Sequence, residues 1–501
     1  MPNDISSRKV EIETQEFAGN GYGSEEEINE RQRRERALVR RLDYFIAPVL
    51  MALNLISYLD RGNIGFAATQ GMTRDIHLKE NQLNTAVSIF YIFYILAEFP
   101  TSVLVKRLRF DRVIPTITLC WGKETSLSLD FSLAEYSRMR VASIGNDVNN
   151  SPRPCFVQSF GSLVATRILL GFFEGCLFPS ITLCLCNWYK RDELGLRIAL
   201  LFIASALAGA FGGLLAWAVF HLDGISNMAG WRWLYILEGL ITVVWAGLCT
   251  VLLPQNYETA YFLDDEQKAL MKKRAEEMDA YGGGSGHYTK KDIKEAAKDV
   301  KSWLHALIQI NIVTVLYGFS TFLPIIIKDG FQFSTIQAQY LVIPVNIWGS
   351  MVYAIGAILS DRYSARFLPL VVCAPFGIAG YTILLCDVPS EIRYFATYLI
   401  AIPCFLCTGG NMDSADPNKY RRSYSGPDIP SGAGPAFTLG HAWSLGSLSI
   451  AFIGWWIMWT IYTRRQASKD KILTEGAIYA DASFTDRSPN FKYQIDKNCI
   501  I

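Results

Sequence analysis

The sequence predicts an all-α polytopic membrane protein, and three observations support this fold class. Uncharged runs recur along the 501 residues, at 44–59, 81–97, 198–222, 239–257, 302–327, 330–360, 367–386, 394–412 and 437–463. A membrane-spanning helix needs about 20 mostly apolar residues, so most runs are long enough or nearly so. Only 19% of residues are charged, fewer than the roughly one quarter of a soluble domain. Those charges fall mainly between the runs, which disfavours the alternative of a large soluble enzyme with buried helices.

The distribution of basic residues predicts the orientation in the membrane. Residues 1–42 are polar, show no signal-peptide pattern, and carry six arginines at 31, 33, 34, 36, 40 and 41. A cytoplasmic flank explains this cluster better than nuclear localisation does. Later basic segments at 106–112, 190–197, 254–301, 362–366 and 464–471 alternate with loops poorer in Lys and Arg. Since short cytoplasmic loops carry the excess of Lys and Arg, we expect both termini in the cytoplasm.

The chain divides near its middle. We expect a cytoplasmic N-terminal tail at 1–42, a helix bundle at 43–253, a central cytoplasmic loop at 254–302, a second bundle at 303–463 and a cytoplasmic tail at 464–501. In the central loop, Asp264 and Gln267 have the spacing of a capping box and predict the start of a helix. Two apolar blocks of similar size are typical of transporters built from repeats.

Charged side chains inside the spans are functional candidates, because they are expensive to place in hydrocarbon. Asp60, Arg61 and Asn63 end the first span, and Arg167 and Glu174 lie in one later span. Arg167 and Glu174 are two turns apart, or about 10 Å, on one helix face. A buried Arg can bind a carboxylate and a buried Glu can carry a proton, so the pair suits proton-coupled anion binding. A structural helix–helix ion pair is the alternative for either residue.

Other span residues are weaker candidates. Tyr94, Tyr317, Phe322 and Asn346 are possible substrate contacts, although aromatic residues in spans more often face lipid or the core. Glu238 follows 230–233 near the start of a span, and we expect it to serve structural packing. Gly209, Gly212 and Gly213 predict a seam of close helix packing.

The segment 356–366 ends the eighth span with Gly356, Asp361, Arg362 and Arg366. A Gly followed by Asp-Arg and another basic residue at a cytoplasmic turn predicts a charge clamp between neighbouring helices, which can break as the halves move. Together with the two-halved layout, this pattern resembles the major facilitator superfamily.

Three segments narrow the resemblance: 59–65 (LDRGNIG), 167–179 (RILLGFFEGCLFP) and 188–197 (WYKRDELGLR). They are similar to the anion:cation symporter family, specifically its fungal allantoate-permease-like branch. Residues 230–233 (GWRW) and 437–441 (FTLGH) add weaker support. The resemblance implies two six-helix bundles, alternating access, and proton-coupled uptake of vitamins, ureides or carboxylic acids. It implies further that Arg61 and Arg167 hold the anion, that Asn63 lines the site, and that Glu174 takes part in proton coupling; we add Asp60 to the proton-coupling candidates.

Two segments depart from the family pattern. The third span is apolar only over 113–122, about half a crossing, and 123–154 is rich in charge, Ser and Asn. At the expected eleventh span, 413–434 is almost wholly polar, yet the parity of the basic loops still requires a crossing there. We hypothesise an imperfect gene model, because Gly122-Lys123 can be encoded by GGTAAG, which contains a splice-donor-like sequence. A divergent loop is the alternative, since loops tolerate insertion.

The sequence therefore predicts a secondary active transporter, not an enzyme. No P-loop is present to support ATP-driven transport, and no cofactor or metal site is expected. The 47 Lys and Arg nearly balance the 46 Asp and Glu, so no nucleic-acid partner is expected. The expected partners are a small organic anion, protons and the lipid bilayer, with the chain acting as a monomer in the plasma membrane. Efflux of a fungal metabolite and a non-transporting nutrient sensor are the alternatives.

Overall fold

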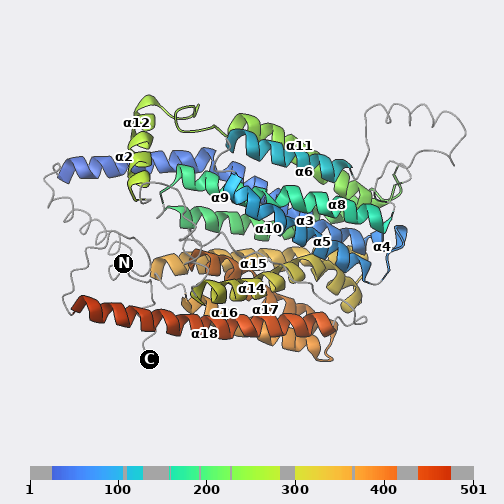
Figure 1. Ribbon diagram of the computed structural model, residues 1–501. Helices are drawn as coiled ribbons and strands as arrows, with labels where there is room; N and C mark the ends of the chain where they lie inside the picture. The colour runs from blue at the N-terminus through green and yellow to red at the C-terminus, as the bar shows by residue number, and fades with distance from the viewer. Residues whose placement is uncertain are drawn as a thin grey trace, which may run out of the picture.

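A computed structural model describes residues 25–79, 81–104, 110–127, 157, 159–190, 193–225, 228–281, 300–363, 367–414 and 438–474, and these contain helices but no strands (Figure 1). The helices are α2 (Glu25–Phe45), α3 (Ala47–Thr69), α4 (Met72–Asp75), α5 (Gln82–Leu104), α6 (Phe110–Leu127), α8 (Phe160–Gly175), α9 (Leu177–Trp188), α10 (Leu194–Phe220), α11 (Gly230–Leu252), α12 (Asp265–Tyr281), α14 (Val300–Ile325), the short π-helix η3 (Ile326–Gly330), α15 (Thr335–Tyr363), α16 (Phe367–Leu385), α17 (Ser390–Ser414) and α18 (Thr438–Thr474). Among the described residues, 8 helical stretches are long and apolar enough to cross a membrane. The prediction of an all-α polytopic membrane protein is confirmed.

The helices form two bundles that lie side by side. Helices α3 to α11 make one half and α14 to α18 make the other (Figure 1). The halves meet where α3 and α10 pack against α14 and α15. The rings of Phe202 on α10 and Tyr353 on α15 lie 6.2 Å apart in the shared core. Both helices are apolar around their circumference, and their outward side chains such as Phe211 and Met351 are exposed, as in membrane spans.

Glycines allow the close approach of the two halves. Gly209 on α10 lies against the side chain of Asn346 on α15, and Gly213 lies against the backbone carbonyl of Gln339. On α3, Gly65 lies against the backbone of Thr321 on α14. A Cβ atom at any of these positions would collide with the opposite half, because small residues set how closely such helices approach. The predicted glycine seam is confirmed, and it joins the two halves.

Within the first half, α8 lies directly on α5. Gly171 and Gly175 on α8 face the backbone of Phe90 and Tyr94. Their spacing of four residues puts both glycines on one side of the helix. This contact fixes the depth at which α8 presents Arg167 and Glu174 to α3.

The helices of the second half determine where the chain must cross. Gly377 and Gly380 on α16 contact Pro403 and Ile400 on α17, so these two helices are antiparallel. Helix α18 is also antiparallel to α16, because His441 lies near Tyr381 while Trp459 stacks on Phe367. Helices α17 and α18 are therefore parallel, so α17 ends and α18 begins at opposite ends of the bundle, which the parity of the basic loops also requires.

The two segments that depart from the family pattern lie mostly outside the described residues. For 123–154, the structure describes 123–127, which continue α6 beyond the apolar segment 113–122. Glu124 and Thr125 in this last turn are buried. For 413–434, only the last turn of α17 is described. The gene-model hypothesis remains a hypothesis.

Helices α2 and α12 form a polar cap at one end of the first half (Figure 1). Helix α2 leads into α3 through Ile46, and α12 follows the capping contact in which the Asp264 backbone N–H donates to Gln267 Oε1 at 3.4 Å. Ion pairs hold the two helices together, with Arg31–Glu277 at 2.5 Å, Arg34–Glu266 at 2.5 Å and Arg41–Asp264 at 2.7 Å.

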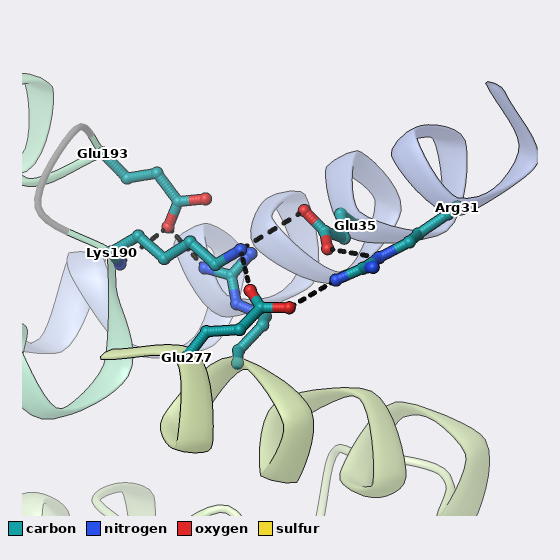
Figure 2. A network of polar contacts seen from close by, with 6 residues as sticks. Arg31, Glu35, Lys190, Glu193 and Glu277 are labelled. Atoms are coloured by element: carbon teal, nitrogen blue, oxygen red, sulfur yellow. Dashed lines mark hydrogen bonds and ion pairs between the residues drawn. The ribbon is translucent and has the colours of Figure 1, made fainter. Parts of the chain in front are cut away.

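The cap is also tied to the loop between α9 and α10 (Figure 2). Lys190 contacts Glu277 at 2.9 Å and Glu35 at 3.7 Å, and the buried Arg274 donates to Glu193 at 2.6 Å. Partial burial alone would raise the pKa of Glu277, but hydrogen bonds from Lys190 and Arg31 outweigh it and hold that pKa below its ordinary value. The acidic residues Glu35, Glu193 and Glu277 balance the charge of the basic residues Arg31, Lys190 and Arg274.

Candidate functional site

Two adjacent residues of α3 point to different neighbours. Successive residues on an α-helix are about 100° apart around the axis, so Asp60 and Arg61 face different parts of the bundle. Both are buried, with side chains 1% and 6% exposed. Two polar clusters result, one around Arg61 at the boundary between the halves and one around Asp60 inside the first half.

The Arg61 cluster is built on an ion pair between α3 and α8. Arg61 Nε donates to Glu174 Oε1, and Ser57 Oγ donates to the same oxygen at 2.5 Å. Glu174 is fully buried, and its Oε2 accepts no hydrogen bond among the described residues. Burying two charges is tolerated only when they are paired. In this conformation Glu174 therefore forms an ion pair between two helices, with Arg61 as its partner.

Arg61 also reaches the second half. Its Nη1 donates to the hydroxyl of Tyr317 on α14 at 2.7 Å. The guanidinium carbon lies 4.5 Å from the ring centre of Tyr58, 4.6 Å from that of Tyr94 and 5.6 Å from that of Tyr317. Tyr91 packs on Tyr317 with ring centres 4.8 Å apart. The cation therefore lies in an aromatic cage, which stabilises a desolvated guanidinium. Tyr58, Tyr91 and Tyr317 are only partly buried.

The Asp60 cluster lies between α3, α6, α8 and α11. Asn63 Nδ2 donates to Asp60 Oδ1 at 3.3 Å, and Thr125 of α6 donates to Asp60 Oδ2 at 3.5 Å. Arg167 of α8 donates to the hydroxyl of Tyr235 at 3.1 Å, and its charge acts on Asp60. Arg167 and Glu174 thus belong to different clusters, as their separation along α8 suggests.

Glu238 of α11 belongs to the same cluster and was missed as a functional candidate. Its side chain is 1% exposed, and its carboxyl group lies at hydrogen-bonding distance from that of Asp60. The sequence placed Glu238 near the start of a span and predicted a packing role. It lies two turns inside α11, and a carboxyl group at that depth is itself the signal that marks a functional candidate.

The remaining predicted residues lie elsewhere. Phe322 is partly buried and packs against the core between the halves, and Asn346 donates to the backbone carbonyl of Val342 at 2.9 Å on its own helix. The structure therefore does not join either residue to the Arg61 cluster. Gly356 contacts Leu406 between α15 and α17. The side chains of Asp361 and Arg362, and the whole of Arg366, lie outside the described residues, so the charge clamp stays a prediction.

The part of the chain that the structure describes holds no group of three or more His, Cys, Asp or Glu side chains that could bind a metal ion. The polar interactions of both clusters are charge pairing and hydrogen bonding. These are the interactions through which membrane proteins move ions and polar solutes.

Comparison with known proteins agrees with this architecture. The family model of the Major Facilitator Superfamily matches residues 50–418. An uncharacterized transporter of Schizosaccharomyces pombe is 34% identical over 492 residues, covering 95% of this chain and 93% of the relative. The high-affinity nicotinic acid transporter of Saccharomyces cerevisiae is 27% identical over 484 residues, covering 92% of this chain and 85% of the relative.

Solved structures share the fold at low sequence identity. The proton:xylose symporter XylE bound to 6-bromo-6-deoxy-D-glucose has a TM-score of 0.56 at 14% identity, covering 86% of this chain and 91% of that one. A bacterial homologue of the lysosomal transporter Spinster has a TM-score of 0.52 at 15% identity, covering 87% and 86%. With two helix bundles, buried charges at their boundary and a family model that matches most of its length, the chain belongs to the major facilitator superfamily and is a secondary transporter, not an enzyme.

Proposed function

We propose that this transporter is a proton-coupled symporter of a small organic anion, within the anion:cation symporter family and its fungal allantoate-permease-like branch. It works as a monomer in the plasma membrane by alternating access. The observation that carries the proposal is the position of Arg61, which is paired with Glu174 of its own half and with Tyr317 of the other. A cation that both halves contact is suited to bind an anion and to sense which half has moved.

Charge balance explains how anion binding and proton binding are linked. Without substrate, Arg61 and Glu174 neutralise each other. A substrate carboxylate that pairs with Arg61 displaces Glu174, and an unpaired buried carboxylate is strongly unfavourable. If Glu174 then takes up one proton, the loaded site is neutral again. One anion and one proton therefore enter together, because either alone leaves a net charge in the protein interior.

The same geometry provides the conformational link. Tyr317 lies on α14, whereas Arg61 and its other partners lie on α3, α5 and α8. When the halves rock, the distance between Arg61 and Tyr317 changes while the contacts inside the first half persist. A ligand can shift a conformational equilibrium only by binding one state better than the other, and an anion held between Arg61 and Tyr317 meets that condition.

The aromatic cage indicates the kind of anion. The rings of Tyr58, Tyr94 and Tyr317 surround the cation, and Tyr91 packs on Tyr317. Aromatic faces favour a flat partner. A planar carboxylate of the vitamin or ureide type combines a charge for Arg61 with a ring for stacking. The similarity to a nicotinic acid transporter supports this class. Arg61 is a better anion site than Arg167, because Arg61 contacts both halves, whereas Arg167 lies inside the first half beside Tyr235.

The test is uptake by yeast cells that lack their own organic-acid carriers. Cells that express the chain receive labelled nicotinate and a panel of labelled planar carboxylates, in acidic and neutral medium, with and without a protonophore. We expect at least one acid to accumulate faster in acidic medium, and a protonophore or Arg61→Ala to abolish the accumulation. Arg74→Gln is the matched control, since Arg74 is exposed on α4. Net export of preloaded acid would favour efflux instead.

A further inference from the structure

The carboxyl groups of Asp60 and Glu238 lie together in an arrangement that is unfavourable if both are ionised. They come from α3 and α11, are both 1% exposed, and lie at hydrogen-bonding distance from each other. Neither oxygen of Glu238 receives a hydrogen bond from any described residue. Two ionised carboxylates have no proton to donate, so they repel each other and leave acceptors unsatisfied. One proton between them removes both problems.

A second buried acceptor in the same cluster also lacks a donor. Asn63 is fully buried and donates Nδ2 to Asp60, but its own Oδ1 receives no hydrogen bond among the described residues. Buried polar atoms are nearly always satisfied in folded proteins. Unpaired oxygens of Asn63 and Glu238 on either side of one carboxyl group mark a place that is short of hydrogen-bond donors.

The charges around the pair give the stoichiometry. Arg167 is the cation whose charge acts on both carboxyl groups, and the negative charge of Glu174 acts on Asp60 more strongly than Arg167 does. Tyr235, Thr125 and Trp121 contribute neutral polar groups from α11 and α6. Two carboxylates against one guanidinium leave one net negative charge, and one proton brings this cluster to neutrality. The Arg61–Glu174 pair is already neutral.

We propose that Asp60 and Glu238 together bind a single proton, with Glu238 as an essential half of the site. The proton comes from water and returns to water, so one O–H bond breaks as another forms. The pair is separate from the Arg61–Glu174 pair but linked to it, because Arg167 acts electrostatically on Asp60, Glu238 and Glu174. The role of this proton in transport rests on the proposed function, whereas its binding does not.

Infrared difference spectroscopy on the purified full chain in lipid nanodiscs tests proton binding without any substrate. A protonated carboxyl group gives a carbonyl stretching band that an ionised one lacks, and titration from neutral to alkaline pH removes it. We expect the wild type to show this band at neutral pH. Glu238→Gln and Asp60→Asn should each abolish the same band, because either change leaves one carboxylate neutralised by Arg167. Glu276→Gln, which changes an exposed carboxyl group on α12 outside this pair, should leave the band in place.

The outcomes separate the possibilities. If Glu238→Gln keeps the band and Asp60→Asn removes it, the proton belongs to Asp60 alone and the role of Glu238 is overturned. If neither change removes it, the pair holds no proton. Should Glu238→Gln fail to fold, Glu238→Asp keeps the carboxyl group and is expected to keep a shifted band, so an unshifted band there contradicts the proposal. Failure of anion transport in cells would leave these spectra unaffected.

Discussion

Arg61 of α3 donates a 2.7 Å hydrogen bond to the hydroxyl of Tyr317 of α14, so a buried cation of one half is bound to the other half. The same guanidinium pairs with Glu174. When the two halves move relative to each other, a contact between them must change.

Removing the Tyr317 hydroxyl should therefore weaken the anion site without destroying it. In Tyr317→Phe the ring still packs on Tyr91, but Arg61 loses one charge-assisted hydrogen bond. We expect the apparent affinity for a transported anion to fall about tenfold, or about 1.4 kcal/mol. Tyr58→Phe is the matched control, since the Tyr58 ring faces Arg61 without a hydrogen bond between them. Concentration dependence of uptake measures both, and equal losses would argue against a specific role for Tyr317.

Glu174→Gln should separate exchange from accumulation. The amide keeps the shape of the side chain and mimics its protonated form, so Arg61 stays available to an anion. We expect exchange of labelled for unlabelled substrate to persist, while accumulation driven by a proton gradient is lost. Ser57→Ala removes the hydrogen bond to Glu174 and a long one from Arg61, and should retain accumulation. A Glu174→Gln protein that still concentrates substrate would rule out this proton role.

The glycines of α8 should be intolerant of even one methyl group. In Gly175→Ala the new Cβ meets the backbone of Tyr94, which cannot move aside as a flexible side chain can. Overpacking of this kind costs about 1–3 kcal/mol, so we expect a lower thermal unfolding temperature in detergent. The control is Gly247→Ala on α11, where a Cβ meets no atom within 4 Å. Equal unfolding temperatures for the two variants would contradict the close contact of α5 and α8.

The cap formed by α2 and α12 should loosen in acid. The folded state lowers the pKa of Glu277 below its ordinary value of about 4.3. Its contribution to stability is therefore fully present above that ordinary value and is lost as the pH falls through the folded pKa. We expect hydrogen exchange in α12 to speed up in acid and in high salt, and in Glu277→Gln at neutral pH, by an amount that corresponds to up to about 1 kcal/mol. Glu276→Gln, at an exposed neighbouring position, should have no such effect.

The sequence predicted the fold class and several components of the site, but not how they pair. Arg61, Arg167 and Glu174 stood out because charge inside an apolar span is rare. That Glu174 pairs with Arg61 could not be foreseen, since the two are 113 positions apart and Arg167 was a nearer partner in sequence. The ion pairs between α2 and α12 join residues more than 220 positions apart and were missed for the same reason.

The polar and aromatic candidates show the limit of reading single residues. Tyr94 and Tyr317 face Arg61, whereas Phe322 packs against the core and Asn346 satisfies its own helix backbone. These four residues lie in spans of similar composition. Only the packing of neighbouring helices decides which face of each helix points to the site. Glu238 could have been found by applying the rule for buried charge without regard to its place in the span.

Transport by the purified chain in proteoliposomes tests the central claim most directly. Labelled nicotinate and related planar carboxylates are offered outside, with the external medium more acidic than the lumen, and the label inside is followed over time. The account predicts transient accumulation of at least one acid above its external concentration, collapse on addition of a protonophore, and no accumulation for Arg61→Ala, while Arg74→Gln behaves as wild type. Accumulation that ignores the proton gradient, or that persists in Arg61→Ala, would contradict it.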